Sequence, residues 1–346
     1  MVKFVPMANC TQIVGPALSP ARPDWQSVWA DSVRSPVELC RLLGLDSALA
    51  AEAEQAADSF ALLVPRPYLA RIRRGDPTDP LLLQVLPRSG ERATPPGYSP
   101  DPLGEFGAHC GPGLLQKYQG RILMVTTGAC AVHCRFCFRR HFPYEKVAAA
   151  VPPWGPALQK IAVDRSLQEV VLSGGDPLTL PDRELAQLAE DLAEIPHLRR
   201  LRIHSRLPTV IPQRVTDELI LWLRGSRLSP IMVVHVNHPA EIDQAVAEAF
   251  GRLVDAGIPV LNQSVLLRGI NDRAEVLAEL CRQLVDLRVM PYYLHQLDPV
   301  VGAAHFEVPI ATGIALIAEL RTRLPGYAVP RYVREATGGT SKEILA

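Results

Sequence analysis

The stretch RILMVTTGACAVHCRFC, residues 121–137, joins a short apolar run directly to three clustered cysteines. Five further apolar runs follow along the chain, rich in Val, Ile and Leu and separated by amphipathic helical patterns. Such runs are typical of strands that are covered on both faces. Strands that alternate with helices predict a parallel sheet, either open and doubly wound or curved into a barrel. The six runs cover residues 121–127, 169–173, 201–205, 231–237, 260–266 and 289–294.

The segments on either side of this region differ from it in pattern. Residues 1–115 carry helical patterns and predict a mostly helical N-terminal extension. It includes a segment rich in Pro and Gly at residues 87–113, which is expected to cross the surface. Residues 116–303 hold the strand and helix units. Residues 304–346 form a C-terminal segment that carries Gly-Gly-Thr-Ser-Lys342 near its end.

The charge balance limits the classes of partner. The 346 residues include 36 Lys and Arg and 36 Asp and Glu. This balance argues against binding of nucleic acid or anionic lipid through the overall charge of the protein. The first residues lack the apolar run of a secretory signal, and no stretch approaches the roughly 20 apolar residues that span a bilayer. We therefore expect a cytoplasmic protein with neither nucleic acid nor membrane as a partner.

The cysteines indicate a metal site. The chain has seven, an odd number, and three of them, Cys130, Cys134 and Cys137, fall within eight positions. Three thiolates on a short loop can hold three irons of a [4Fe–4S] cluster and leave the fourth iron open. The alternative is a zinc site that uses His133 or a distant residue as fourth ligand. Structural zinc sites usually carry a second cysteine or histidine pair, and the sequence has none.

The spacing C-x-x-x-C-x-aromatic-C, with Phe136 as the aromatic residue, resembles the signature of the radical S-adenosylmethionine (SAM) superfamily. The resemblance implies an α/β fold, a partial (β/α)6 barrel, in which SAM binds the open iron and one electron cleaves it to a 5′-deoxyadenosyl radical. It also implies that Phe136 lies near the adenine and that Ser173-Gly174-Gly175-Asp176 receives SAM. Both motifs follow a strand, as in barrels whose functional groups gather at the C-terminal strand ends.

Longer stretches resemble the lysine 2,3-aminomutase family. They are residues 134–142, 235–239, 262–272 and 291–293, and the most specific is NQSVLLRGIND at 262–272. The stretch 296–306 and the short C-terminus resemble the branch that prepares β-lysine for the modification of elongation factor P. The resemblance therefore implies an isomerase that converts L-lysine to β-lysine, with pyridoxal phosphate (PLP) as a further cofactor.

The resemblance also gives roles to single residues. Lys342 is expected to bind PLP, with Arg121 and Tyr118 as further PLP contacts. Arg139, two residues after the last cluster cysteine, is expected to pair with the substrate carboxylate, which suits a planar, permanently charged fork. The remaining expected contacts are an acidic pair for the distal substrate ammonium, Asp298 and Glu335, and two strand-end contacts to SAM, His235 and Gln263.

Several alternatives stay open at this point. One alternative is a 2,3-aminomutase for lysine or another amino acid that serves catabolism or secondary metabolism. By the resemblance, catabolic aminomutases carry Asp where this chain has Glu335, which leaves the exact substrate open. A radical enzyme without PLP and a non-catalytic Fe–S or zinc-binding adaptor are two others. The implied partners are L-lysine, a reducing electron donor and a ligase that acts on elongation factor P, and a homo-oligomer is a further expectation.

Overall fold

The computed structural model describes residues 24–144, 154–336 and 338–346. At its centre lies one sheet whose strands follow one another in sequence order. The six apolar runs form six neighbouring parallel strands, and a seventh strand continues the parallel series. These strands are β3 (Arg121–Thr127), β4 (Glu169–Gly174), β5 (Arg200–Ser205), β6 (Ser229–His235), β7 (Val260–Val265), β8 (Met290–His295) and β9 (Arg331–Arg334).

The strand order distinguishes between the two predicted architectures. A doubly wound sheet reverses its order at a switch point, and its helices then cover both faces. Here each strand pairs with the next one along the chain, so right-handed crossovers place all the connecting helices on the same face. The parallel strands therefore form a partial barrel, and the predicted fold class is confirmed.

Side-chain alternation along the strands separates the two faces of this barrel. On β5, Leu201 and Ile203 are buried in the main apolar cluster together with helix residues such as Leu188 and Phe250. The alternate residues of the same strand face the barrel interior. The helices of the outer layer and the C-terminal segment are α6 (Gly155–Val163), α7 (Asp182–Ala193), α8 (Leu207–Val210), α9 (Asp217–Gly225), α10 (Gln244–Asp255), α11 (Ala274–Asp286) and α12 (Ile310–Arg323).

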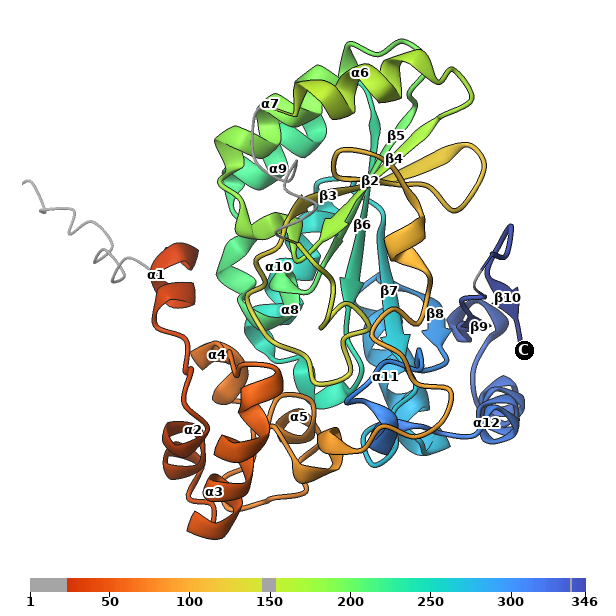
Figure 1. The fold of residues 1–346 in the computed structure, drawn as a ribbon. Helices are drawn as coiled ribbons and strands as arrows, with labels where there is room; N and C mark the ends of the chain where they lie inside the picture. The colour runs from red at the N-terminus through yellow and green to blue at the C-terminus, as the bar shows by residue number, and fades with distance from the viewer. Residues whose placement is uncertain (1–23, 145–153, 337) are drawn as a thin grey trace, which may run out of the picture.

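Short antiparallel strands extend both edges of the parallel series. At one edge, β2 (Leu114–Leu115) pairs with β3 and with β1 (His109–Gly111). At the other edge, β10 (Glu343–Ile344) pairs with β9, in a register that sets Glu343 opposite Arg334. The chain end therefore folds back beside the last barrel strand (Figure 1). Among the described helices, none is both long and apolar enough to cross a membrane.

The N-terminal helices share a hydrophobic core with the barrel. Residues such as Leu39 and Leu81 belong to the same buried cluster as the barrel residues Ile122 and Val170. In Figure 1 most of these helices gather at the lower left, far from α6 and α7, and the first of them lies above the others. The predicted division into three segments stays a prediction. The helices are α1 (Trp25–Ala30), α2 (Pro36–Leu43), α3 (Ser47–Ala56), α4 (Arg66–Leu69) and α5 (Pro80–Leu83).

The Pro- and Gly-rich segment does not simply cross the surface, as the sequence had suggested. Its Glu91 is only 4% exposed and forms a buried ion triad with two arginines of the loop that follows β3. Arg135 donates to Glu91 from Nε and Nη2, at 2.8 and 2.5 Å, and Arg140 donates from Nη2 at 2.7 Å. The segment is drawn inward because two buried guanidinium groups need a carboxylate.

We expect Glu91→Gln to lower the free energy of unfolding by about 3–5 kcal/mol, because it leaves two buried cations without a counter-charge. Urea denaturation followed by circular dichroism measures this change. The matched control is Asp255→Asn, which removes the exposed ion pair with Arg288 and should cost within about 1 kcal/mol. Equal effects of the two substitutions would contradict the interpretation.

Candidate active site

The three clustered cysteines lie on the loop that follows β3, and backbone contacts from the N-terminal extension hold this loop. The amide of His133 donates to the carbonyl of Leu63 at 3.0 Å, and the amide of Arg135 donates to the carbonyl of Gln84 at 2.9 Å. Within the loop, the amide of Cys137 donates to the carbonyl of Cys134 at 3.0 Å. The thiols of Cys130, Cys134 and Cys137 are free and half-buried.

The surroundings of His133 bear on the zinc alternative. Its ring stacks on Phe60, with 5.0 Å between centroids, and Nδ1 contacts the carbonyl oxygen of Ala61 at 2.8 Å. Within the described part of the chain, no group of three or more His, Cys, Asp or Glu side chains is placed to hold a single metal ion. A four-iron cube binds each cysteine through a different iron, so its three thiolates need not converge on one point.

The thiols of Cys130 and Cys137 lie in a site that disfavours their ionised form. Burial raises the pKa of Cys130 well above its ordinary value, and the neighbouring Cys137 adds to this effect. Burial, followed by the charge of Cys134, raises the pKa of Cys137 to about 11. Bound iron would supply the missing positive charge and displace the thiol protons. The donor set therefore fits a cationic cluster.

The Ser-Gly-Gly-Asp segment at the end of β4 packs directly against the start of the cysteine loop. A Cβ atom on Gly175 would lie 2.1 Å from the carbonyl oxygen of Ala129. Gly174 has a φ of 121°, and a Cβ atom there would lie 2.7 Å from the carbonyl oxygen of Thr127. The amide of Gly175 donates to that same oxygen at 2.7 Å. The two motifs thus form one unit, and only glycine permits so close an approach.

Asp176 connects the ends of β4 and β5. Its buried carboxylate accepts hydrogen bonds from the hydroxyl of Ser205 at 2.7 Å and from the amides of Arg206 and Leu207 at 2.7 and 3.1 Å. The amide of Leu178 donates at 3.0 Å. The carboxylate thus joins neighbouring strand ends, and its expected role in SAM binding stays a prediction.

Arg139, the expected carboxylate-binding residue, is fixed by a partner that the sequence did not reveal. Its Nε and Nη2 donate to the two carboxylate oxygens of Glu105 at 2.7 and 2.9 Å. Its Nη1 donates to the hydroxyl of Ser173 at 3.0 Å. Glu105 comes from the Pro- and Gly-rich segment and also pairs with Lys117, at 3.3 Å. Motif spacing carries no signal for this pairing, because the partners lie 34 residues apart.

The residues expected to contact PLP and the substrate ammonium come together between the two edges of the barrel. Glu335, just after β9, accepts hydrogen bonds from Tyr118 and from Lys342, the residue that precedes β10. Lys117 lies 3.9 Å from the same carboxylate. Arg121 stacks over the ring of Tyr118, with its guanidinium carbon 4.5 Å from the ring centroid. The terminal hairpin therefore brings Lys342 to the first barrel strand.

The two acids differ in their electrostatic environment. Burial, followed by the charge of Glu335, raises the pKa of Asp298 to about 7. Burial also raises the pKa of Glu335, but the ion pair with Lys342 and the hydrogen bonds from Lys342 and Tyr118 outweigh it and lower the pKa overall. At pH 7 the carboxylate of Glu335 is therefore ionised, and that of Asp298 is close to half protonated. A further cation would therefore bind favourably to the pair.

Neutral polar groups line the inner face of the barrel. Burial lowers the pKa of His235 to about 4 and lowers that of His204 and His295 well below their ordinary value, so all three rings are neutral at pH 7. The amide nitrogen of Gln263 lies 2.8 Å from Nε2 of His295. Buried polar atoms without a partner among the described residues include Nε2 of His204, Oε1 of Gln263 and Nε of Arg206. Such orphaned atoms fit a site that receives a polar ligand.

Comparisons with known proteins extend this picture. No protein-family model matches the chain. An L-lysine 2,3-aminomutase from Escherichia coli is 47% identical, over 94% of this chain and 96% of its own length. The enzymes of the same name from Haemophilus influenzae and Clostridium subterminale are 43% and 37% identical, over 93% and 92% of this chain and 96% and 77% of theirs. A radical SAM methyltransferase structure from Sphaerobacter thermophilus gives a TM-score of 0.43 at 20% identity, over 65% of this chain and 71% of that chain.

Proposed function

This chain belongs to the L-lysine 2,3-aminomutase family and is an isomerase, and from this premise we propose that it converts L-lysine to β-lysine. The reaction moves the amino group from the α-carbon to the β-carbon within one molecule. The observation that carries the proposal is the partly buried acidic pair of Asp298 and Glu335 beside Lys342. Two carboxylates in one partly buried place call for a cation, and the distal ammonium of lysine is such a cation.

The opposite end of the substrate is proposed to bind at Arg139. Its guanidinium is buried and already binds a carboxylate in bidentate fashion, that of Glu105. Lys117 contacts both Glu105 and Glu335, so one chain of ion pairs runs from the carboxylate-binding end to the acidic end. A zwitterionic substrate with a second ammonium matches this alternation of charges.

Three bound groups are proposed to supply the reactive chemistry. Cys130, Cys134 and Cys137 would hold a [4Fe–4S] cluster, and Phe136, His235, Gln263 and the residues 173–176 would contact SAM. Lys342, Arg121 and Tyr118 would hold PLP. The orphaned polar atoms of His204 and Gln263 on the inner face support ligands at this position. When bound, the cluster and SAM supply a hydrogen-abstracting radical, and PLP supplies a conjugated ring that stabilises an unpaired electron.

The side chains of this chain position the reactants and exclude water. Arg139 orients the carboxylate, and Asp298 and Glu335 orient the distal ammonium, so the carbon chain is held at both ends. Lys342 would hold PLP in place of its contact with Glu335, and the substrate ammonium would then serve as the counter-charge of Glu335. The buried histidines stay neutral, which leaves the charge balance of the site to the ion pairs.

The wider role is proposed from the family branch. The product would be handed to a ligase that acts on elongation factor P, and a cytoplasmic reducing partner would supply the electron. A catabolic or secondary-metabolic aminomutase, for lysine or another amino acid, is the second candidate. Glu335 bears on this choice, because its side chain is one methylene longer than the Asp that the family resemblance implies for catabolic enzymes, which would shift the carboxylate and change the fit of the substrate.

We expect the anaerobically reconstituted protein to convert L-lysine to β-lysine in the presence of SAM, PLP and dithionite, as measured by chiral liquid chromatography with mass detection. Asp298→Asn and Glu335→Gln should each lower kcat/KM roughly 100-fold, because each removes a partly buried counter-charge of the substrate ammonium. Turnover of glutamate or tyrosine without any β-lysine from lysine would refute the proposed substrate.

Borohydride reduction in the presence of PLP should attach the cofactor irreversibly to Lys342, because a lysine that binds the PLP aldehyde forms a reducible C=N bond. Peptide mapping by mass spectrometry locates the label. Lys117 is the matched control, since it contacts the same carboxylate, Glu335, from the other edge of the sheet. A label on Lys117 in place of Lys342 would count against the assignment.

The pKa of Asp298 near 7 predicts a pH dependence of substrate binding. Its carboxylate is ionised above this pH and protonated below it, so the affinity for a cationic substrate falls as the pH falls. We expect the KM for lysine to rise by up to about tenfold per pH unit below 7. Steady-state kinetics from pH 6 to pH 8 measure this, and Asp298→Asn should give a flatter profile. Parallel profiles of the two proteins would show that another group titrates.

A further inference from the structure

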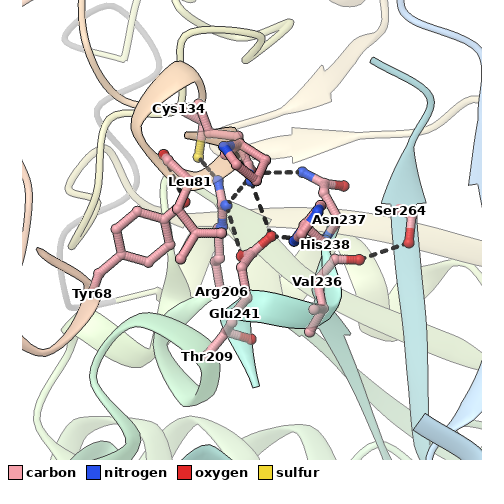
Figure 2. Close-up of polar contacts among 12 residues, drawn as sticks. Tyr68, Leu81, Cys134, Arg206, Thr209, Val236, Asn237, His238, Glu241 and Ser264 are labelled. Carbon is pink, nitrogen blue, oxygen red and sulfur yellow. Dashed lines mark hydrogen bonds and ion pairs between the residues drawn. The ribbon is translucent and has the colours of Figure 1, made fainter. Parts of the chain in front are cut away.

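One arginine outside the predicted motifs reaches the cluster loop. Arg206 directly follows β5, and its Nη1 donates to the sulfur of Cys134 at 2.6 Å. Within the described residues, no other side chain donates a hydrogen bond to a cysteine sulfur. Figure 2 shows the guanidinium between Cys134 on one side and Glu241 on the other. The arginine is 5% exposed, so this contact is shielded from water.

The position of this guanidinium is fixed by acceptors from two different parts of the fold. Its Nη2 donates to Oε1 of Gln84 at 2.7 Å and to Oε2 of Glu241 at 3.0 Å. Gln84 belongs to the N-terminal extension, directly after α5, and Glu241 lies in the turn that follows β6. The rings of Phe136 and Tyr68 lie 5.4 and 5.7 Å from the guanidinium carbon.

The acceptors are themselves held in place, as Figure 2 shows for Glu241 and its neighbours. Oε1 of Glu241 accepts from the amides of Asn237 and His238, at 2.9 and 3.1 Å, and from Nε2 of Gln84 at 3.1 Å. The side-chain amide of Asn237 also donates to Oε1 of Gln84, at 3.0 Å. Arg206 therefore cannot move away from Cys134 without breaking several buried hydrogen bonds.

We propose that Arg206 is a positioning residue that stabilises the reduced state of the cluster through its hydrogen bond to the sulfur of Cys134. The inference rests on the proposed function, because it requires the [4Fe–4S] cluster at Cys130, Cys134 and Cys137. Reduction adds one negative charge, and hydrogen bonds to cluster sulfurs and nearby charges are among the factors that set the reduction potential. A guanidinium is always protonated, so its effect does not depend on pH. Through Gln84, which holds Arg206, the N-terminal extension would then help to set the potential at which the cluster accepts an electron.

The test is an anaerobic redox titration of the reconstituted cluster, monitored by electron paramagnetic resonance in the absence of substrate. Arg206→Gln together with Glu241→Gln removes both charges of the buried pair, so neither is left unpaired. We expect the ratio of reduced to oxidised cluster at a fixed potential to fall about tenfold, which equals 59 mV for one electron. Arg206→Lys keeps the charge but not the planar fork, so its shift should be smaller. Arg282→Gln, on the exposed face of α11, is the control and should leave the potential unchanged.

Each outcome separates this inference from the proposed function. If the wild-type protein binds zinc and no iron, the cluster assignment fails and the inference fails with it. If the wild-type cluster forms but the double variant and Arg206→Lys keep its potential, the inference alone is refuted. It is refuted equally if both variants stay folded by circular dichroism but bind no iron, because Arg206 would then act in cluster assembly.

Discussion

A buried guanidinium must find a carboxylate, and this requirement organises the interior of the barrel. Arg135 and Arg140 meet at Glu91, and Arg139 binds Glu105 with two parallel hydrogen bonds. Arg206 likewise pairs with Glu241. In each case the desolvated cation would be costly without its partner, so the pairing dictates where distant segments of chain must lie. The loop that carries the cysteines is thus held by ion pairs as well as by apolar packing.

These ion pairs divide into two kinds. The triad at Glu91 lies behind the loop, and its two arginines also donate to the carbonyl oxygens of Phe60 and Gly302, so its charges are paired and most of its donors are bound within the protein itself. The pairs at Glu105 and Glu335 line the proposed substrate site, where a carboxylate and an ammonium group of a ligand could replace one partner of each. The first kind keeps the scaffold rigid, and the second kind holds the site in a charged and paired state before the substrate enters.

The sequence allowed the barrel to be predicted almost completely, because local periodicity carries that information. The predicted run at 121–127 coincides with β3, and the other five runs differ from their strands by two residues or fewer at either end. Periodicity alone left the doubly wound alternative open, since strand order depends on which strands pair. The cysteine loop and the Ser-Gly-Gly-Asp segment were also predictable, because short motifs at strand ends share one edge of a parallel sheet.

The partners of these motifs were not predictable in the same way. Glu91 and Glu105 lie in a segment whose Pro and Gly content indicates a surface crossing, yet each is only 4% exposed. Arg206 and Glu241 belong to ordinary strand-to-helix connections, where a single charged residue is usually solvated. Pairings across 34 to 49 residues leave no periodic trace in the sequence.

The N-terminal extension therefore does more than cover one end of the barrel. It contributes Glu91 behind the cysteine loop, Glu105 beside Arg139 and Gln84 beside Arg206. Each of these three residues contacts an arginine near the cluster cysteines. One of the arginines, Arg139, is also the proposed contact of the substrate carboxylate. A barrel without this extension would expose those guanidinium groups to water, where they would be mobile and screened. The extension thus converts a set of flexible cations into fixed ones, which is the condition for an electrostatically preorganised site.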